Sequence, residues 1–142
     1  MDQYSWHDKY SIGVDEIDTQ HRQILDVINQ ISRAIELHRT EQVLTEQVPE
    51  LTKFLESHFA TEEKYMLEYD YPGYEEHHKE HVGFFREYNA HLKSFIDASE
   101  KSTLLKKADC TKVLDFVVNW IAKHIDEIDM KMASFLVSED SD

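Results

Sequence analysis

Apolar residues recur in four stripes along the chain, at alternating steps of three and four, which is typical of amphipathic helices that pack into a bundle. The first stripe begins between Asp15 and Thr19 and carries His21, Ile24, Ile28, Ile31, Ile35 and His38. The second carries Leu44, Val48, Leu51, Leu55, His58, Glu62 and Tyr65. The third carries His77, His81, Phe84, Tyr88, His91 and Phe95, and the fourth carries Cys110, Leu114, Val117, Ile121, His124 and Ile128. The pattern therefore predicts four helices.

Polar or turn-forming segments separate these stripes at residues 39–41, 69–73 and 97–102. The clearest break is the sequence Tyr-Asp-Tyr-Pro-Gly at residues 69–73, because proline and glycine there do not continue a helix. Short connections make consecutive helices antiparallel, so we expect an all-α, left-handed, up-down-up-down four-helix bundle. Pro49 lies inside the second stripe, so that helix either is kinked or ends near Val48 and restarts; we favour the kink.

The length of 142 residues fits one domain, and a domain of this size buries roughly 68–70% of its unfolded surface. Only three Gly and two Pro are present, which favours helices over a fold rich in tight turns. We expect an N-terminal arm over residues 1–14, the bundle over residues 15–137 and an acidic, frayed tail over residues 138–142. Cys110 lies on an apolar stripe, so we expect a small buried side chain rather than a redox group.

A formal net charge of −14 disfavours binding to nucleic acid or to anionic membrane surfaces, because like charges repel. Residues 1–10 contain no apolar run, and no stretch reaches the roughly 20 apolar residues that a membrane span needs. We therefore expect no nucleic-acid partner, no membrane span and a cytoplasmic location.

Seven potential metal ligands are predicted to lie at one level of the bundle: His21, His58, Glu62, His77, His81, His124 and Asp129. His58 and Glu62 are four residues apart and share a helix face, as do His77 and His81. His21 and His58 are equally distant from the turn at residues 39–41, and His124 mirrors the His77/His81 pair about residues 101–102. Two antiparallel hairpins would therefore bring all of them to one end of the bundle.

Imidazole and carboxylate ligands suit iron, zinc, manganese or cobalt, and the absence of thiolates argues against a closed structural zinc site. Two octahedral ions that share both carboxylates and one oxide or hydroxide would keep a single open position. One vacancy favours capture of a small diatomic ligand over catalysis, so we predict a binding protein without catalytic residues. Asp129 fits less well, because five residues after His124 it lies about 140° around an ideal helix and requires a local distortion.

The sequence resembles the hemerythrin family, most closely its bacterial single-domain forms, the bacteriohemerythrins. The segment Ile12 to His21 resembles the family's opening motif, and His58-Phe59-Ala60-Thr61-Glu62-Glu63 resembles its H-F-x-x-E-E segment. His77 and His81 after Pro72 resemble the pair of the third helix, and His124 with Asp129 resembles the final H-x-x-x-x-D motif. The resemblance spans about Trp6 to Phe135, and all seven ligand positions are filled.

The resemblance implies that His77, His81 and His124 hold one iron, that His21 and His58 hold the other, and that Glu62 and Asp129 bridge them. The implied cofactor is two iron ions (Fe2+/Fe3+) with a bridging oxide or hydroxide, which bind dioxygen reversibly at the two-histidine iron. Residues at matching positions imply an apolar oxygen pocket formed by Ile24, Phe59, Trp120, Ile121 and Ile125. The expected function is an oxygen carrier or store, with an unidentified oxygen-consuming protein as a partner.

Three other functions would use the same open coordination position or the same metal. The domain would act as an oxygen or redox sensor if a partner reads a movement, or as a di-iron peroxidase or nitric-oxide-handling enzyme if it turns over. It would be an iron-handling protein if it releases metal easily, and zinc is an alternative occupant of the ligands. The remaining histidines, His7, His38, His78 and His91, are expected to lie at the surface, on the rim or in the core rather than to bind metal.

Overall fold

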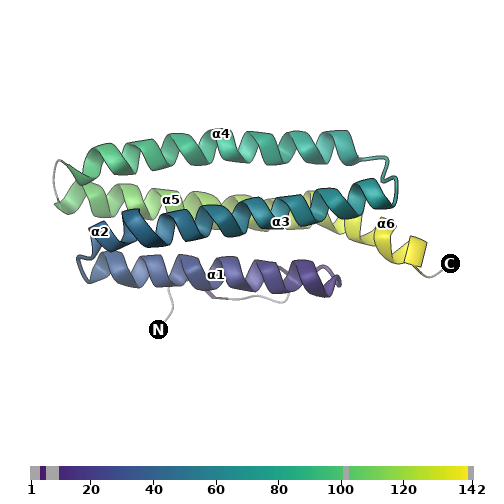
Figure 1. The fold of residues 1–142 in the computed structure, drawn as a ribbon, viewed down its shortest axis with the longest axis horizontal. Helices are drawn as coiled ribbons and strands as arrows, with labels where there is room; N and C mark the ends of the chain where they lie inside the picture. The colour runs from purple at the N-terminus through teal and green to yellow at the C-terminus, as the bar shows by residue number, and fades with distance from the viewer. Residues whose placement is uncertain (1–3, 6–9, 101–102, 141–142) are drawn as a thin grey trace.

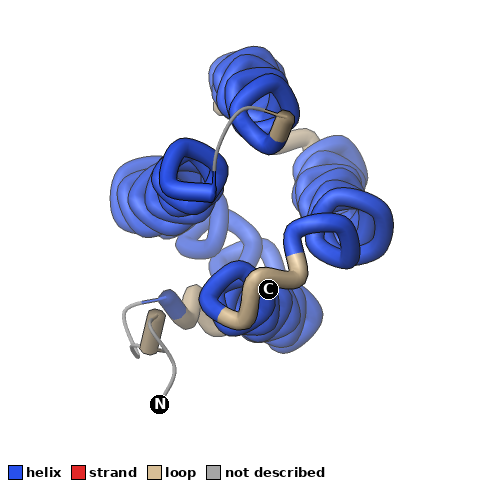
Figure 2. The backbone as a smooth tube through the Cα atoms, turned by 90° about the vertical axis from the view of Figure 1, so that its left-hand side faces the viewer, coloured by secondary structure: helices blue, strands red, loops and turns tan. Residues whose placement is uncertain are grey.

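A computed structural model describes residues 4–5, 10–100 and 103–140. Its elements are α1 (Asp15–Glu36), α2 (Thr40–Gln42), η2 (Val43–Gln47), α3 (Val48–Glu68), α4 (Tyr74–Ser99), α5 (Thr103–His124), η3 (Ile125–Asp129) and α6 (Met130–Asp140). The long helices run side by side along the molecule (Figure 1) and surround a common axis when the bundle is viewed from one end (Figure 2). The predicted all-helical four-helix bundle is confirmed, whereas its handedness stays a prediction.

The first helix begins where three acidic side chains, Asp15, Glu16 and Asp18, favour a helix N-terminus through its dipole. It ends at Glu36, and His38 then adopts a positive φ of 61° that reverses the chain. The backbone N–H of residue 39 donates to the carbonyl of Ala34 at 2.9 Å, which closes this turn. The next helix therefore returns antiparallel to α1, with the turn where the sequence predicts it.

Pro49 does not end the second helix. Its ring would crowd the carbonyl four residues earlier in an ordinary α-helix, and it has no N–H to donate. The chain accommodates it with a wide π-helical turn, Val43–Gln47, which ends two residues before the proline, and α3 then runs from Val48 to Glu68. The alternative of a helix that stops near Val48 and restarts is therefore wrong, and the distortion that we expected at Pro49 takes the form of a wide turn.

Two apolar cores fill the bundle, one on each side of a layer of buried histidine, glutamate and aspartate. The larger core gathers residues such as Ile24, Ile28, Leu55, Phe84 and Val117. The smaller core contains Ile12, Ile17, Met66, Ile125, Met132, Ala133 and Leu136. Burying one such large apolar side chain stabilises the fold by roughly 1.5–3 kcal/mol. The polar layer is thus held between two sets of apolar contacts.

The last helix is longer than the sequence indicates. It continues from α5 through η3 into α6 and ends at Asp140, so the part of the predicted tail from Ser138 to Asp140 is helical. Residues 141–142 lie outside the described ranges, and the division into arm, bundle and tail stays a prediction. Cys110 is 1% exposed, which confirms the expected buried side chain.

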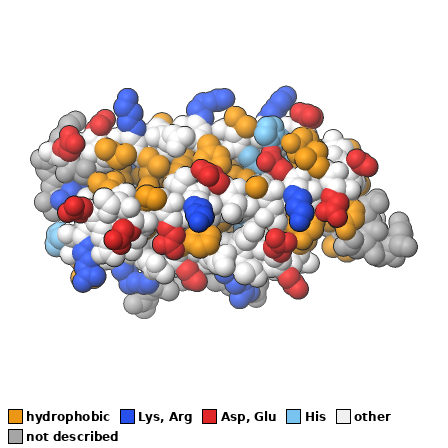
Figure 3. All heavy atoms as spheres, in the orientation of Figure 1, with side chains coloured by type: hydrophobic (Ala, Val, Ile, Leu, Met, Phe, Trp, Pro, Cys, Tyr) orange, Lys and Arg blue, Asp and Glu red, His pale blue; other side chains and the backbone are white. Residues whose placement is uncertain are grey.

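Charged side chains of both signs are scattered over the face shown in Figure 3, with apolar side chains between them. Within the described part of the chain, none of the helices combines the length and the apolar character that crossing a bilayer requires.

Candidate metal centre

The seven predicted ligands meet in one buried cluster, and each of them is at most 4% exposed. The helix α1 contributes His21, α3 contributes His58 and Glu62, and α4 contributes His77 and His81. The last residue of α5 is His124, and the last residue of η3 is Asp129. The structure therefore confirms that the two hairpins bring these residues to one level.

Their ligand atoms form two groups that share one residue. The first group is Glu62, His77, His81 and His124. The second is His21, His58, Glu62 and Asp129. Within each group the potential donor atoms all lie within 4.8 Å of one another. The cluster thus has the form of a binuclear site, with three histidines on one side and two on the other.

The spacing of the imidazole nitrogens fits a shared metal ion. His21 Nε2 and His58 Nε2 are 3.1 Å apart, and His77 Nε2 and His124 Nε2 are 3.0 Å apart. Neighbouring ligands in an octahedron with bonds of about 2.1 Å are separated by about 3 Å. Ring nitrogens that converge at this distance present their lone pairs to one point, as the ligands of one ion do.

The two carboxylates reach both groups. One oxygen of Glu62 lies 2.9 Å from His58 Nε2, and its other oxygen lies 3.1 Å from His77 Nε2. Asp129 behaves in the same way, because Oδ1 is 3.0 Å from His124 Nε2 and Oδ2 is 3.9 Å from His21 Nε2. Each carboxylate is therefore placed to bridge two ions.

The wide turn η3 resolves the apparent misfit of Asp129. In an ordinary α-helix a residue five positions after His124 would point away from it. Residues Ile125–Asp129 instead form a π-helical turn, in which hydrogen bonds join residues five apart. The extra residue of this turn returns Asp129 to the face of His124, which is the local distortion that the sequence required.

Several polar atoms in the cluster are buried and make no hydrogen bond within the described residues. Both oxygens of Asp129 and both ring nitrogens of His81 are among them. Burying polar groups without partners costs free energy unless hydrogen bonds or a bound ion compensate. Cations between these donors would satisfy them, so the residues present fit a pair of metal ions.

The electrostatics of the cluster also suit cations. Although burial favours the neutral acid, His58 and the neighbouring imidazoles hold the pKa of Glu62 well below its usual range. Burial alone would lower the pKa of His77, but the carboxylates of Asp129 and Glu62, 3.0 and 3.1 Å from its Nε2, outweigh burial and raise that pKa to about 9. Burial lowers the pKa of His21, so this imidazole is neutral and ready to bind. A metal ion takes the place of the protons that the cluster otherwise holds.

Two contacts outside the cluster orient the two-histidine side. His21 Nδ1 lies 2.9 Å from the backbone oxygen of Tyr10, and His58 Nδ1 lies 3.0 Å from Gln20 Oε1. A carbonyl oxygen only accepts, so each Nδ1 carries the hydrogen and each Nε2 is left free for a metal. The amide of Gln20 also donates to Thr61 at 2.9 Å. Sequence reasoning missed Tyr10 and Gln20, because nothing local marks a backbone carbonyl or an amide as a support for a histidine.

Aromatic rings cover the three-histidine side. Phe59 stacks on His81 with ring centroids 4.1 Å apart, and Trp120 stacks on His124 at 4.4 Å. The sequence prediction placed Phe59 and Trp120 in the wall of an oxygen pocket. In the structure their closest ring contacts are with histidines of the three-histidine group.

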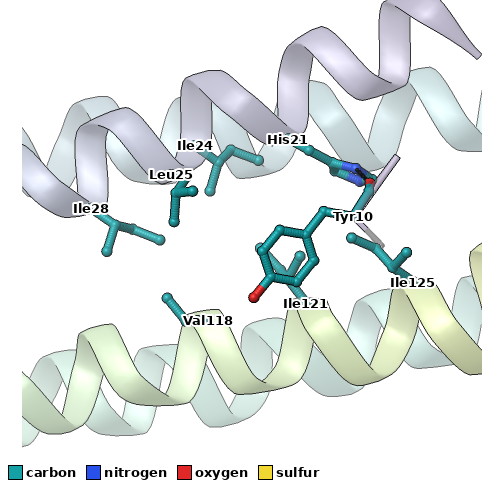
Figure 4. A pocket seen from close by; sticks show the side chains of 8 residues that line it. All are labelled: Tyr10, His21, Ile24, Leu25, Ile28, Val118, Ile121 and Ile125. Carbon is teal, nitrogen blue, oxygen red and sulfur yellow. Dashed lines mark hydrogen bonds between the residues drawn. The ribbon is translucent and has the colours of Figure 1, made fainter. Parts of the chain in front are cut away.

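A small apolar cavity lies beside the two-histidine side (Figure 4). The predicted pocket residues Ile24, Ile121 and Ile125 line it. The other lining residues are Tyr10, His21, Leu25, Ile28 and Val118. Phe59 and Trp120 are not part of its lining, so the structure gathers three of the five predicted pocket residues around the cavity, and a place for the other two in an oxygen pocket stays a prediction.

The model of the hemerythrin HHE cation-binding domain matches residues 12–136. The chain belongs to the hemerythrin family. It is therefore a cation-binding domain of that family, with a buried binuclear site made of histidine, glutamate and aspartate. The match covers nearly the whole span over which the sequence resembles hemerythrins.

Hemerythrin relatives align along most of the chain. A bacteriohemerythrin of Clostridium acetobutylicum is 29% identical over 132 residues, which cover 89% of this chain and 95% of that protein. A bacteriohemerythrin of Pseudomonas aeruginosa strain LESB58 is 27% identical over 131 residues, covering 92% and 85%. A myohemerythrin of Riftia pachyptila is 26% identical over 128 residues, covering 90% and 89%. No solved structure matches this hemerythrin chain significantly.

The other histidines that the structure describes lie outside the two metal-binding groups. His38 is exposed in the turn after α1, and His91 packs against Phe116 with ring centroids 4.8 Å apart. His78 is half-buried on α4 and pairs with Glu63. His7 lies outside the described residues.

Proposed function

We propose that this hemerythrin domain binds dioxygen reversibly, as a carrier or store, at two iron ions held by the seven clustered residues. His77, His81 and His124 would hold one ion, and His21 and His58 would hold the other. Glu62 and Asp129 would bridge them, together with an oxide or hydroxide. Two ferrous ions would supply the two electrons that reversible capture of dioxygen requires.

The observation that carries this proposal is the unequal environment of the two sides. The three-histidine side has one more imidazole, and two of its rings are stacked against aromatic side chains. The two-histidine side has fewer protein ligands, and His21 itself lines the apolar cavity. The side with room for another ligand is thus the side that a small apolar molecule can reach.

The cavity wall supports binding without turnover. Apart from the proposed ligand His21 and the phenol of Tyr10, every residue of the wall is aliphatic and offers no acid, base or nucleophile to a bound molecule. The apolar side chains would disfavour water in the space beside His21, which would slow hydrolytic loss of a bound ligand and irreversible oxidation of the metal. With a wall so poor in reactive groups, release by reversal is the expected path.

Iron is the metal that combines this ligand set with the proposed function. Nitrogen and oxygen donors also accept zinc or cobalt, because affinity alone does not select among divalent ions. Zinc has no second accessible oxidation state, so a zinc pair would not exchange electrons with dioxygen as a ferrous pair does. The recipient of the oxygen would be an oxygen-consuming protein.

The test is an optical cycle on the purified, iron-loaded protein, with iron measured beforehand. We expect two iron ions per chain and a visible absorption band that appears in air and disappears on deoxygenation over many cycles. An oxygen electrode should record uptake that stops at one dioxygen per chain. A protein with its iron removed and replaced by zinc serves as the control and should show no band.

Other outcomes would overturn the proposal in favour of a named rival. Continuous consumption of peroxide or nitric oxide in the presence of a reductant indicates an enzyme. Bleaching after a single exposure to air indicates a sensor. Ready loss of iron to a weak chelator indicates an iron-handling protein.

A further inference from the structure

The carboxylate of Asp18 gathers the turn that precedes α1. One oxygen accepts from the backbone N–H of Ile12 at 2.7 Å. The other accepts from the hydroxyl of Ser11 at 2.8 Å and from the backbone N–H of Gly13 at 3.1 Å. Gly13 has a φ of 86°, a conformation that glycine adopts without strain. A single side chain thus determines the path of three consecutive residues.

This turn presents Tyr10 to the metal centre. Its backbone oxygen accepts from His21 Nδ1 at 2.9 Å, while its ring lines the apolar cavity (Figure 4). Ile12 is 6% exposed and packs into the smaller core with Ile17, and this contact holds the turn against the bundle. The position of the Tyr10 oxygen therefore depends on how residues 11–13 are held.

We propose that Asp18 is a positioning residue for the two-histidine metal ion, although it is not one of the seven clustered residues. It acts through the Ser11–Gly13 turn and the Tyr10 oxygen on His21. The Tyr10 oxygen keeps the hydrogen of His21 on Nδ1 and the lone pair of Nε2 directed at the metal. If the turn loosens, His21 loses this acceptor, and its ring is free to rotate or to change tautomer.

The inference rests on the binuclear site and not on the identity of the metal or on dioxygen. The probe is therefore Co²⁺, titrated into the metal-free protein, because its absorption spectrum reports each binding step. A failure of reversible oxygen binding would leave this experiment unaffected, so the two proposals fail separately.

The main variant is Asp18→Ala, which removes all three hydrogen bonds. We expect one of the two Co²⁺ ions to bind about 10- to 100-fold more weakly, as is usual when a partner behind a metal-binding histidine is lost. The other ion, on the three-histidine side, should keep its affinity. Asp15→Ala is the matched control, because Asp15 is an exposed acid in the same first turn. It removes the same charge at the helix N-terminus and should change neither step.

A second variant separates the two parts of Tyr10. Tyr10→Ala removes the ring from the cavity but keeps the backbone oxygen that His21 needs. Because the backbone oxygen remains, we expect a smaller loss of Co²⁺ affinity than in Asp18→Ala. A weakening equal to that of Asp18→Ala would show that the ring, not the Asp18 turn, supports the site, and would overturn the proposal.

Thermal unfolding of the metal-free variants distinguishes positioning from general stability. A merely structural role of Asp18 would lower the melting temperature and weaken both binding steps equally, which would contradict the proposal. If Asp18→Ala does not fold, Asp18→Asn keeps one acceptor oxygen and the size of the side chain. It should weaken the same single step by a smaller factor, and two unchanged steps in this variant would also overturn the proposal.

Discussion

Asp129 Oδ1 lies 3.0 Å from His124 Nε2, although the two residues are five positions apart on one helix. The π-helical turn at residues 125–129 makes this contact, because its extra residue takes up the difference between five positions and the four that an ordinary turn spans. The geometry of one bridging carboxylate therefore depends on backbone hydrogen bonding that apolar periodicity does not reveal.

Shortening and lengthening the wide turn at residues 125–129 by one residue should have different effects on metal binding. Deleting Asp126 places Asp129 four positions after His124, a separation that an ordinary α-helix also puts on one face. We expect this variant to keep most of its metal. Adding one alanine after Asp126 makes the separation six and should remove Asp129 from the cluster, with loss of metal.

Metal-to-protein ratios and far-ultraviolet circular dichroism check this prediction. Asp126→Ala is the length-matched control, since Asp126 is exposed and the substitution keeps the number of residues. Equal loss of metal in the deletion and the insertion would refute the role assigned to the turn.

Replacing His58 should empty one side of the site. His58→Ala removes one of the two imidazoles on that side, so we expect about one metal ion fewer per chain while most of the helix remains. His91→Ala is a control of the same chemistry, because His91 is partly buried on α4 but lies outside both metal-binding groups. Elemental analysis after gel filtration gives the stoichiometry, and unchanged iron in His58→Ala would contradict the assignment.

Metal binding near neutral pH should release protons. In the metal-free cluster the pKa of His77 is raised to about 9, so this ring is protonated at pH 7.5 and must lose its proton to bind a cation. Release should disappear above about pH 9, where His77 is already neutral, and apparent affinity should fall as the pH drops below that value. Titration calorimetry in buffers of different ionisation enthalpy counts the protons, and an absence of release at pH 7.5 would disprove the prediction.

Cys110 should not react in the folded protein. It is 1% exposed, and burial raises the pKa of its thiol to about 12, so almost no thiolate forms at neutral pH. A chromogenic disulfide reagent should modify Cys110 only in urea, with one thiol per chain counted there. Rapid modification without denaturant would show that this part of the larger core opens.

Periodicity and mirror symmetry were sufficient to predict the four helices and the meeting of the seven ligands. The positions of His21 and His58 about one turn, for example, depend only on counting residues along rigid helices. The sequence predicted a distortion at Pro49 and another before Asp129, but not their form as π-helical turns, because the pattern of apolar residues does not determine backbone hydrogen bonding. It also missed Gln20 and Tyr10, whose roles arise from contacts between distant segments. Phe59 and Trp120 stack on His81 and His124, and their expected part in an oxygen pocket stays a prediction.

The layer of buried charge has a consequence for how the molecule unfolds. Without metal, the smaller core is joined to the larger one across buried side chains that repel one another or lack hydrogen-bond partners. The start of α1, the end of α3 and the whole of α6, which contribute to the smaller core, should therefore unfold before the rest of the domain. Bound cations tie these segments to the larger half, and the whole domain should then melt in a single transition. Hydrogen exchange at Met66 and Met132 would follow this change, fast in the stripped protein and slow in the loaded one.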